Sequence, residues 1–179
     1  MKKILCFVCC LLASLLMTSC LEAGMEDPMN SSEKDMTAVT YTYRFLYNDT
    51  IKKGTVNEDI QMGRVCEVVF NKQTEAIEEG DTKGFKTTLT YDMNCIQKSG
   101  ATGSVTKQML YDMFKEKIAK DGLSNLWVYV SVPDAATVIP LNGSPVLGCP
   151  GDFSSERVYR VIAADGTYSD YVLQTVKGF

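Results

Sequence analysis

The sequence predicts a mostly β protein, an antiparallel β-sandwich of about seven strands with one amphipathic helix. Three observations predict this fold. Apolar and polar residues alternate through much of residues 38–179, as in strands with one buried face. Turn-forming residues separate the alternating stretches. Helical periodicity occurs in one stretch, about 104–121, and strands that do not alternate with helices argue against a doubly wound α/β fold.

The alternating stretches are expected to be strands that share one core. The longest covers residues 85–95, where apolar side chains and Thr87 take the odd positions. A second covers residues 39–47, with an aromatic side chain at each odd position from Tyr41 onward. The remaining expected strands lie around residues 66–70, 126–132, 137–141, 159–163 and 171–173. Turn pairs such as Asp165-Gly166 connect them.

Residues 104–121 are expected to form the helix, with Ser104 or Thr106 as N-cap and Gly122 as C-cap. Its apolar residues share one side and are Val105, Met109, Leu110, Met113, Phe114 and Ile118. Such a stripe can dock a partner or a membrane, but covering the domain's own core is the commoner role. We therefore expect this side to pack on the sandwich.

Residues 1–19 are expected to be a signal peptide. Two lysines precede a largely apolar stretch over residues 4–16, which is shorter than the ~20 residues of a membrane-spanning helix. Small residues then precede Cys20 in a pattern that resembles the lipobox of bacterial lipoproteins. Cys20 would become the lipid-bearing N-terminus and the contact with the membrane. The alternative is an ordinary secretory signal that contains a cysteine.

Residues 20–37 are expected to be a flexible tether and residues 38–179 a single β-sandwich domain. The acidic residues soon after Cys20 resemble the signal that places Bacteroidetes lipoproteins on the outer face of the outer membrane. A plain soluble linker explains them equally well. The expected location is the outer membrane, with exposure at the cell surface as one alternative.

Composition excludes several classes of function. Without Lys2 and Lys3 the basic residues fall from 18 to 16 against 22 acidic ones, so the formal charge changes from −4 to −6. No basic block is present, and nucleic acid is not an expected partner. Histidine is absent, which removes Ser-His-Asp and Cys-His catalysis and most zinc sites. We predict no catalytic residue, metal site or cofactor.

Cleavage would leave three cysteines besides Cys20, namely Cys66, Cys95 and Cys149. They allow at most one internal disulfide, and no pair has C-x-x-C spacing. Cys66 and Cys95 lie on apolar faces of expected strands, which favours buried small side chains over a disulfide.

Two further features are weighed as candidate sites. The acidic residues Glu75, Glu78, Glu79 and Asp81 lack the spacing of a calcium loop and are expected in a solvated turn. Asp49-Thr50-Ile51 resembles the acceptor motif for O-glycosylation in Bacteroidetes secreted proteins, so Thr50 is a candidate glycosylation site.

Trp127 and Tyr129 are the candidate ligand-binding residues. They lie opposite the aliphatic face of the strand around residues 126–132. If that strand has a free outer face, the two rings form an exposed platform of the kind that grips sugars. If the strand is covered on both faces, the two rings belong to the core, and this second interpretation is favoured.

The chain from Leu123 onward resembles the C-terminal domain of a family of uncharacterised Bacteroidetes surface lipoproteins. The motifs that carry the resemblance are Leu123-Ser124-Asn125-Leu126, Ala135-Ala136-Thr137-Val138, Pro145 to Phe153 and Tyr159 to Thr167. The resemblance implies an immunoglobulin-like, cadherin-like β-sandwich of unknown function and supplies no catalytic residue. Cys149 and Phe153 depart from the family pattern, which has an aliphatic residue and tryptophan there.

Three functions remain in competition. The first is a non-enzymatic, surface-anchored binding or accessory module for glycan capture or adhesion. The second is a structural or assembly subunit that docks on another envelope protein in an outer-membrane complex. The third and least favoured is a carboxylate-dependent hydrolase, which would need two acids facing each other across a cleft.

Overall fold

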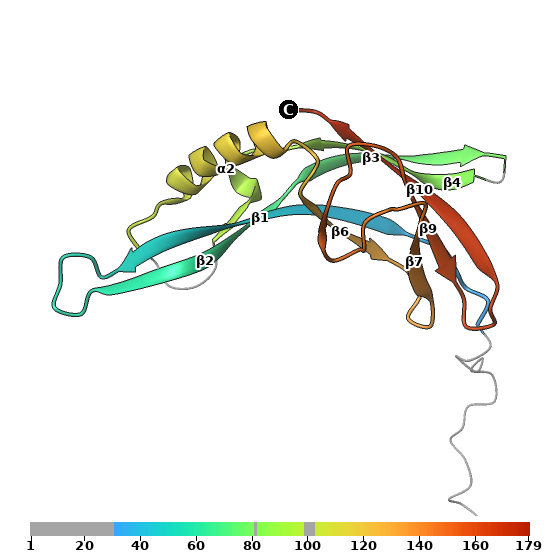
Figure 1. The fold of residues 1–179 in the computed structure, drawn as a ribbon, viewed down its shortest axis with the longest axis horizontal. Coiled ribbons are helices and arrows are strands. Elements are labelled where there is room, and N and C mark those ends of the chain that lie inside the picture. Colours follow the sequence, from blue (N-terminus) through green and yellow to red (C-terminus); the bar gives the residue numbers. More distant parts are fainter. Residues whose placement is uncertain (1–30, 81, 99–102) are drawn as a thin grey trace, which may run out of the picture.

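The computed structural model describes residues 31–80, 82–98 and 103–179 (Figure 1). In these residues the chain is mostly β, with ten strands in two five-stranded sheets and one α-helix. The predicted signal peptide over 1–19, Cys20 and the first part of the tether lie outside the described residues, as does Asp81.

The first sheet has the strand order β5-β2-β1-β6-β8 and the second the order β3-β4-β10-β9-β7. The first contains β1 (Ala38–Ile51), β2 (Asp59–Val69), β5 (Ile96–Lys98), β6 (Leu126–Ser131) and β8 (Pro150–Gly151). The second contains β3 (Asn71–Glu79), β4 (Thr82–Thr90), β7 (Thr137–Leu141), β9 (Arg157–Ile162) and β10 (Tyr168–Lys177). The helix is α2 (Lys107–Asp121), and a short 3-10 turn, η2 (Met93–Cys95), precedes β5.

The prediction of about seven antiparallel strands was wrong in two respects. The described chain has ten strands. The three that were not predicted are β5 and β8, which are too short to show a pattern, and β3, which is an exposed edge strand. In addition, β10 pairs with β4 in parallel, whereas every other pairing is antiparallel. Gly84 permits this approach, because a Cβ there would lie 2.0 Å from the carbonyl oxygen of Val172.

Three of the acidic residues expected in a turn, Glu75, Glu78 and Glu79, lie on strand β3 instead. Glu75 and Glu78 pair in register with Lys86 and Lys83 of β4, so opposite charges face each other across the strands. Edge strands tolerate such a polar sequence because one side stays in water, and charges there discourage pairing with other chains. Their exposure was predicted, but the strand was not.

Strand β1 supplies the centre of the hydrophobic core. Its odd positions over residues 39–47 are all buried, as the alternation predicted. Side chains of both sheets join them, with Leu89, Tyr159 and Leu173 fully buried. Tyr41 connects the two layers, since its ring meets Phe153 edge-on at 6.3 Å and its hydroxyl accepts a hydrogen bond from Thr175 of β10.

Helix α2 covers the inner face of the first sheet (Figure 1). Thr106 caps its N-terminus by accepting a hydrogen bond from the amide of Met109, and Gly122 follows its last residue with φ 57°. The helix was predicted, but the place of Met109 in its packed side was wrong. Met109 is 50% exposed, because the buried stripe follows the i, i+4 spacing of Leu110, Phe114 and Ile118.

Residues 31–37, the last part of the predicted tether, have no regular secondary structure but contact the domain. Met36 is buried, the Asp35 carboxylate accepts a hydrogen bond from the Tyr171 hydroxyl, and the Lys34 ammonium donates to Thr167. The carbonyl of Ser31 accepts a hydrogen bond from the amide of Asp165. The packed part of the chain therefore begins before β1.

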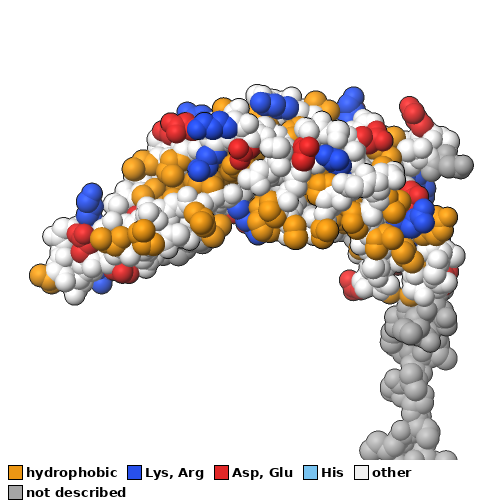
Figure 2. All heavy atoms as spheres, in the orientation of Figure 1, with side chains coloured by type: hydrophobic (Ala, Val, Ile, Leu, Met, Phe, Trp, Pro, Cys, Tyr) orange, Lys and Arg blue, Asp and Glu red, His pale blue; other side chains and the backbone are white. Residues whose placement is uncertain are grey.

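The described part of the molecule is arched, and the end of the β1–β2 hairpin projects from it (Figure 1). We call the hairpin from Leu46 to Val65 the arm. Helix α2 lies on the convex side of the arch, so the outer face of the first sheet lies on its concave side. Hydrophobic side chains gather along the concave side (Figure 2).

Phe114 should be a main support of the core. It is fully buried and meets Tyr91, Tyr43 and Phe70 at ring distances of 4.9, 5.6 and 5.9 Å. Phe114→Ala should lower the free energy of unfolding by about 3–5 kcal/mol, because it leaves a cavity between these rings. Urea unfolding measures the loss. Met109→Ala on the same helix is the control, and an equal loss in both variants would contradict this packing.

Candidate functional site

The main candidate site is an open pocket of about 580 Å³ on the outer face of the first sheet. Strands β1, β2 and β6 form its floor, and β5 and β8 border it. The residues that line it are Arg44, Phe45, Leu46, Val65, Glu67, Gln97, Asn125, Trp127 and Pro150. Aliphatic and aromatic surface is thus combined with four planar polar side chains.

Arg44 organises the polar side of the pocket. Its Nε and Nη2 atoms donate to Oε1 of Glu67 at 2.8 and 2.6 Å. Its guanidinium lies over the indole of Trp127, 4.6 Å from the ring centroid, and 5.8 Å from the ring of Tyr129. The hydrogen bond that Arg44 donates to Glu67 raises the pKa of Arg44 further, so the cation is permanent. Each side chain of the pair is about one-third exposed, which leaves it accessible to a ligand.

Strand register brings these residues together. Arg44 pairs with Glu67 across β1 and β2, while Trp127 of β6 pairs with Thr42, two residues before Arg44 on the same face. The residues before and after Thr42, Arg44, Glu67 and Trp127 in the sequence are buried in the core, so the pleat directs these four side chains to the outer face. The pocket therefore follows from antiparallel pairing of three strands whose other face forms the core.

The interpretation that Trp127 and Tyr129 belong to the core was wrong. Both are partly exposed on the outer face of β6, while Leu126 and Val128 on the other face are fully buried. The helix lies on the opposite side of the sheet (Figure 1), so it does not cover these two rings. Trp127 lines the pocket, and Arg44 lies over its ring and that of Tyr129, so they are not a bare platform.

Sequence reasoning missed Arg44 and Glu67 as site residues. A signal was present, because Arg44 takes an even position in a strand whose odd positions are aromatic, and Glu67 lies between Cys66 and Val68. What the sequence does not contain is the register that places these two side chains beside each other and beside Trp127.

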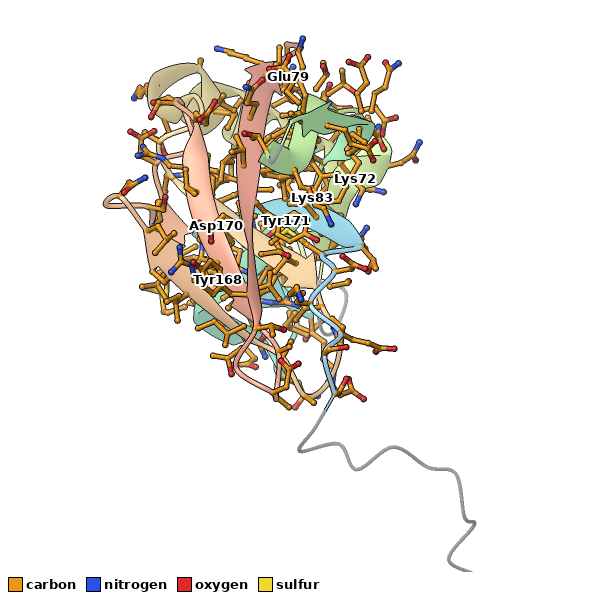
Figure 3. The ribbon with its side chains drawn as sticks, turned by 90° about the vertical axis from the view of Figure 1, so that its right-hand side faces the viewer. Lys72, Glu79, Lys83, Tyr168, Asp170 and Tyr171 are labelled. Carbon is orange, nitrogen blue, oxygen red and sulfur yellow. The ribbon has the colours of Figure 1, made fainter. Side chains whose placement is uncertain are left out.

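A similar group of side chains occurs on the second sheet, where it does not line the pocket. Arg160 of β9 bonds to Asp170 of β10 at 2.7 and 2.8 Å, and its guanidinium lies 3.8 Å from the ring centroid of Tyr168. Figure 3 shows Tyr168 and Asp170 on this face. This group has the same kinds of side chain as Arg44, Glu67 and Trp127 but does not line the pocket. Variants in it can therefore serve as controls for variants in the pocket.

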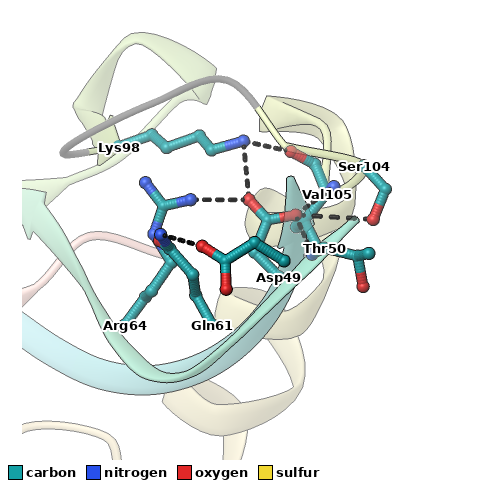
Figure 4. Close-up of polar contacts among 8 residues, drawn as sticks. Asp49, Thr50, Gln61, Arg64, Lys98, Ser104 and Val105 are labelled. Atoms are coloured by element: carbon teal, nitrogen blue, oxygen red, sulfur yellow. Dashed lines mark hydrogen bonds and ion pairs between the residues drawn. The ribbon is translucent and has the colours of Figure 1, made fainter. Parts of the chain in front are cut away.

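A second polar cluster lies at the base of the arm and centres on Asp49 (Figure 4). The Asp49 side chain is fully buried, and its Oδ2 atom is 2.9 Å from Arg64 and 3.2 Å from Lys98. Its Oδ1 atom accepts hydrogen bonds of 2.9 Å from the amides of Thr50 and Val105. Because the carboxylate is enclosed and saturated with donors, the cluster joins the arm, β5 and the start of α2.

The ionised state of Asp49 depends on these donors. Burial alone would raise its pKa, but hydrogen bonds from Val105, Lys98 and Thr50 outweigh burial and lower the pKa below its ordinary value. Space is also restricted, since a Cβ on Gly103 would lie 2.2 Å from this carboxylate. The cluster therefore requires glycine at position 103.

Thr50, the candidate glycosylation site, adjoins this cluster. Its backbone belongs to β1, its carbonyl accepts a hydrogen bond from the amide of Ser104, and its side chain is partly buried. The neighbouring Asp49 of the motif is enclosed rather than displayed. Glycosylation of Thr50 stays a prediction.

Cys66 and Cys95 are free and buried, as predicted, while Cys149 is free and exposed. Burial raises the pKa of the Cys66 thiol to about 11, which keeps it protonated and unreactive at neutral pH. In the described residues no three acidic or cysteine side chains converge as metal ligands do. Over the same residues, no helix combines the length and apolar character needed to cross a bilayer.

Fold and site together define a mostly β protein that carries an open, mixed apolar and polar pocket on one sheet face. The chain belongs to the DUF5018-related family, whose model matches residues 36–174. It is similar to a crystal structure from Bacteroides fragilis NCTC 9343, provisionally described as a secreted protein, with 26% identity and a TM-score of 0.57. That match covers 86% of this chain and all of the other. No curated protein matches the chain.

Asp49 should make stability depend on pH in the acid range. Because its pKa is lowered in the folded state, its contribution is complete above the ordinary aspartate pKa of about 3.9 and is lost as the pH falls through the folded pKa. Asp49→Asn should cost about 3 kcal/mol at pH 7, since Arg64 and Lys98 lose a buried partner. The difference from wild type should narrow below pH ~4.

Urea unfolding at a series of pH values measures this difference. Asp112→Asn is the matched control, because Asp112 pairs with Lys115 on the exposed side of α2. A pH-independent loss in Asp49→Asn, or an equal loss in the control, would show that the buried charge is not responsible.

Proposed function

We propose that the protein is a non-enzymatic, lipid-anchored binding protein of the cell envelope that holds a glycan in the pocket lined by Arg44, Glu67 and Trp127. The observation that carries the proposal is the combination of a partly exposed indole with planar hydrogen-bonding groups around one open cavity. Sugar rings present apolar C–H faces and pairs of hydroxyl groups, so they need both kinds of surface.

The polar groups suit hydroxyl pairs. Arg44 has five N–H donors, of which the ion pair with Glu67 uses two, and Glu67 uses only one oxygen in that pair. Gln97 and Asn125 add amide groups that both donate and accept. The ring of Pro150 and the uncovered part of the indole give an apolar surface on which a sugar ring can lie. The volume of about 580 Å³ is within the range of small-ligand sites.

A hydrolase is less well supported by this geometry. A glycosidase needs two carboxyl groups on opposite sides of the scissile bond. The described lining of the pocket has one carboxylate, Glu67, and it is bound to Arg44. A paired carboxylate favours binding rather than proton transfer.

The location rests on sequence and on the comparison. The Bacteroides protein of similar fold is provisionally described as secreted, which fits a cell-envelope or extracellular location. Attachment to the outer membrane through Cys20 is our extension from the lipobox-like residues before it. The immunoglobulin-like sandwich is likewise part of the proposal, supported by two sheets around one core, although the parallel β4–β10 pair departs from an all-antiparallel arrangement.

Trp127→Ala tests the glycan site. Oligosaccharides that bind wild-type protein on a glycan array should bind the variant about 5- to 150-fold more weakly, because a stacked ring contributes roughly 1–3 kcal/mol. The melting temperature should change little, since the indole is outside the core. Titration calorimetry with the bound sugar measures the affinity.

Tyr168→Ala, which alters the similar group on the second sheet, is the matched control and should keep full affinity. Loss of binding in both variants, or a large loss of stability in Trp127→Ala alone, would refute the site. An array on which the wild type binds no sugar would refute the ligand class.

Cys20 should carry the lipid. Wild-type protein should incorporate labelled palmitate and appear in the membrane fraction at the mass of the cleaved, acylated chain. Cys20→Ala should remain unlabelled. Wild-type protein that is cleaved but carries no label would instead show an ordinary secretory signal.

A further inference from the structure

The arm has an unusual distribution of side chains. Its inner side holds the charged cluster of Asp49, while its outer side is apolar and exposed. Leu46 and Val65, which pair in register, are 64% and 44% exposed, and Ile60 and Met62 are 63% and 73% exposed. No charged residue alternates with these four on the outer side of the arm. Exposed apolar side chains grouped on one side of an element are typical of a contact surface.

The tip of the arm continues this pattern. Val56 is fully exposed at its end, and Lys52 and Lys53 are exposed in the same turn. Two backbone hydrogen bonds, from Thr55 to Lys52 and from Glu58 to Thr55, hold the turn in shape. The Glu58 carboxylate accepts a 2.6 Å hydrogen bond from the amide of Gly54 and so is used within the turn. The tip therefore presents one exposed apolar side chain and two exposed lysines in a single turn.

The position of the arm indicates what it meets. The described chain starts at the lower right of Figure 1 and the arm ends at the lower left, and both lie on the concave side of the arch. Cys20 precedes Ser31 by eleven residues, which span at most about 40 Å when fully extended. A lipid on Cys20 would therefore hold the start of the described chain within about 40 Å of the bilayer, on the side of the arch toward which the arm also projects.

We infer that the arm is a second membrane contact, which rests with its distal part, around Val56, Ile60 and Met62, on the lipid surface that holds the anchor. Val56, Ile60 and Met62 enter the boundary between headgroups and acyl chains, and Lys52 and Lys53 pair with lipid phosphates. The lipid anchor attaches the chain at one point, and a second contact would also fix the orientation of the domain on the membrane. This inference rests on the lipid anchor of the proposed function. Leu46 and Val65 at the base of the arm also line the glycan pocket, so they are not assigned to the membrane contact.

The test places a fluorescent reporter on the arm of the lipidated protein. Val56→Cys is labelled with an environment-sensitive dye in a Cys149→Ser background, because Cys149 is the exposed thiol of the described residues. The protein is reconstituted into vesicles of phosphatidylethanolamine and phosphatidylglycerol that contain a chain-labelled quencher lipid. Glu116→Cys, labelled in the same way on the exposed side of α2, is the control.

The dye at position 56 should be quenched at least about threefold more strongly than the dye at position 116. Lys52→Glu with Lys53→Glu should reduce that quenching, because the headgroup contacts are lost. If mass spectrometry shows lipid on Cys20 and the two dyes are quenched equally, the arm faces water or a protein and the inference is overturned. If Cys20 carries no lipid, the anchor itself is wrong and the inference falls with it.

Discussion

Strand β1 builds two surfaces at once, because successive side chains of a strand point to opposite faces. Its odd positions over residues 39–47 fill the core, and their burial fixes the even positions on the outer face. Arg44 therefore lies outside, between Glu67 of β2 and Trp127 of β6. A slip of one residue would bury Arg44 and expose Tyr43. The packing energy of the core, which fixes the register of β1, therefore also fixes the relative positions of the pocket residues.

The arm is the part of the β1–β2 hairpin that extends beyond the hydrophobic core. A two-stranded hairpin is marginal on its own. Asp49 continues the inward-facing odd positions of β1, so a carboxylate points inward where an apolar side chain would be expected, and the register shift beside it places one extra residue on β2. Arg64 and Lys98 neutralise the carboxylate, so a polar cluster replaces hydrophobic packing as the internal support. Apolar residues such as Ile60 and Met62 then lie on the water side, which reverses the usual distribution and makes the outer face a contact surface.

Much of the fold could be predicted from the periodicity of apolar residues in the sequence alone. The alternation over 39–47 and the helix near 104–121 were confirmed, because each buries one regular face. Strand β3 was missed because an edge strand in water needs no apolar face, and the parallel β4–β10 pair was missed because pairing partners leave no local pattern. The candidate site was half predicted: Trp127 was named but assigned to the core, since a single sequence cannot say which sheet face is covered.

The two arginine groups show why residue types alone do not define the site. Arg44 with Glu67 and Trp127, and Arg160 with Asp170, repeat one arrangement of ion pair and aromatic ring on two sheets. Only the first is bordered by the short strands β5 and β8, which bring Gln97 and Pro150 to the rim of a cavity. These strands have three and two residues and no periodicity to detect. The pocket therefore depends on neighbours that only the folded topology supplies, and a glycan would distinguish the two groups by shape rather than by chemistry.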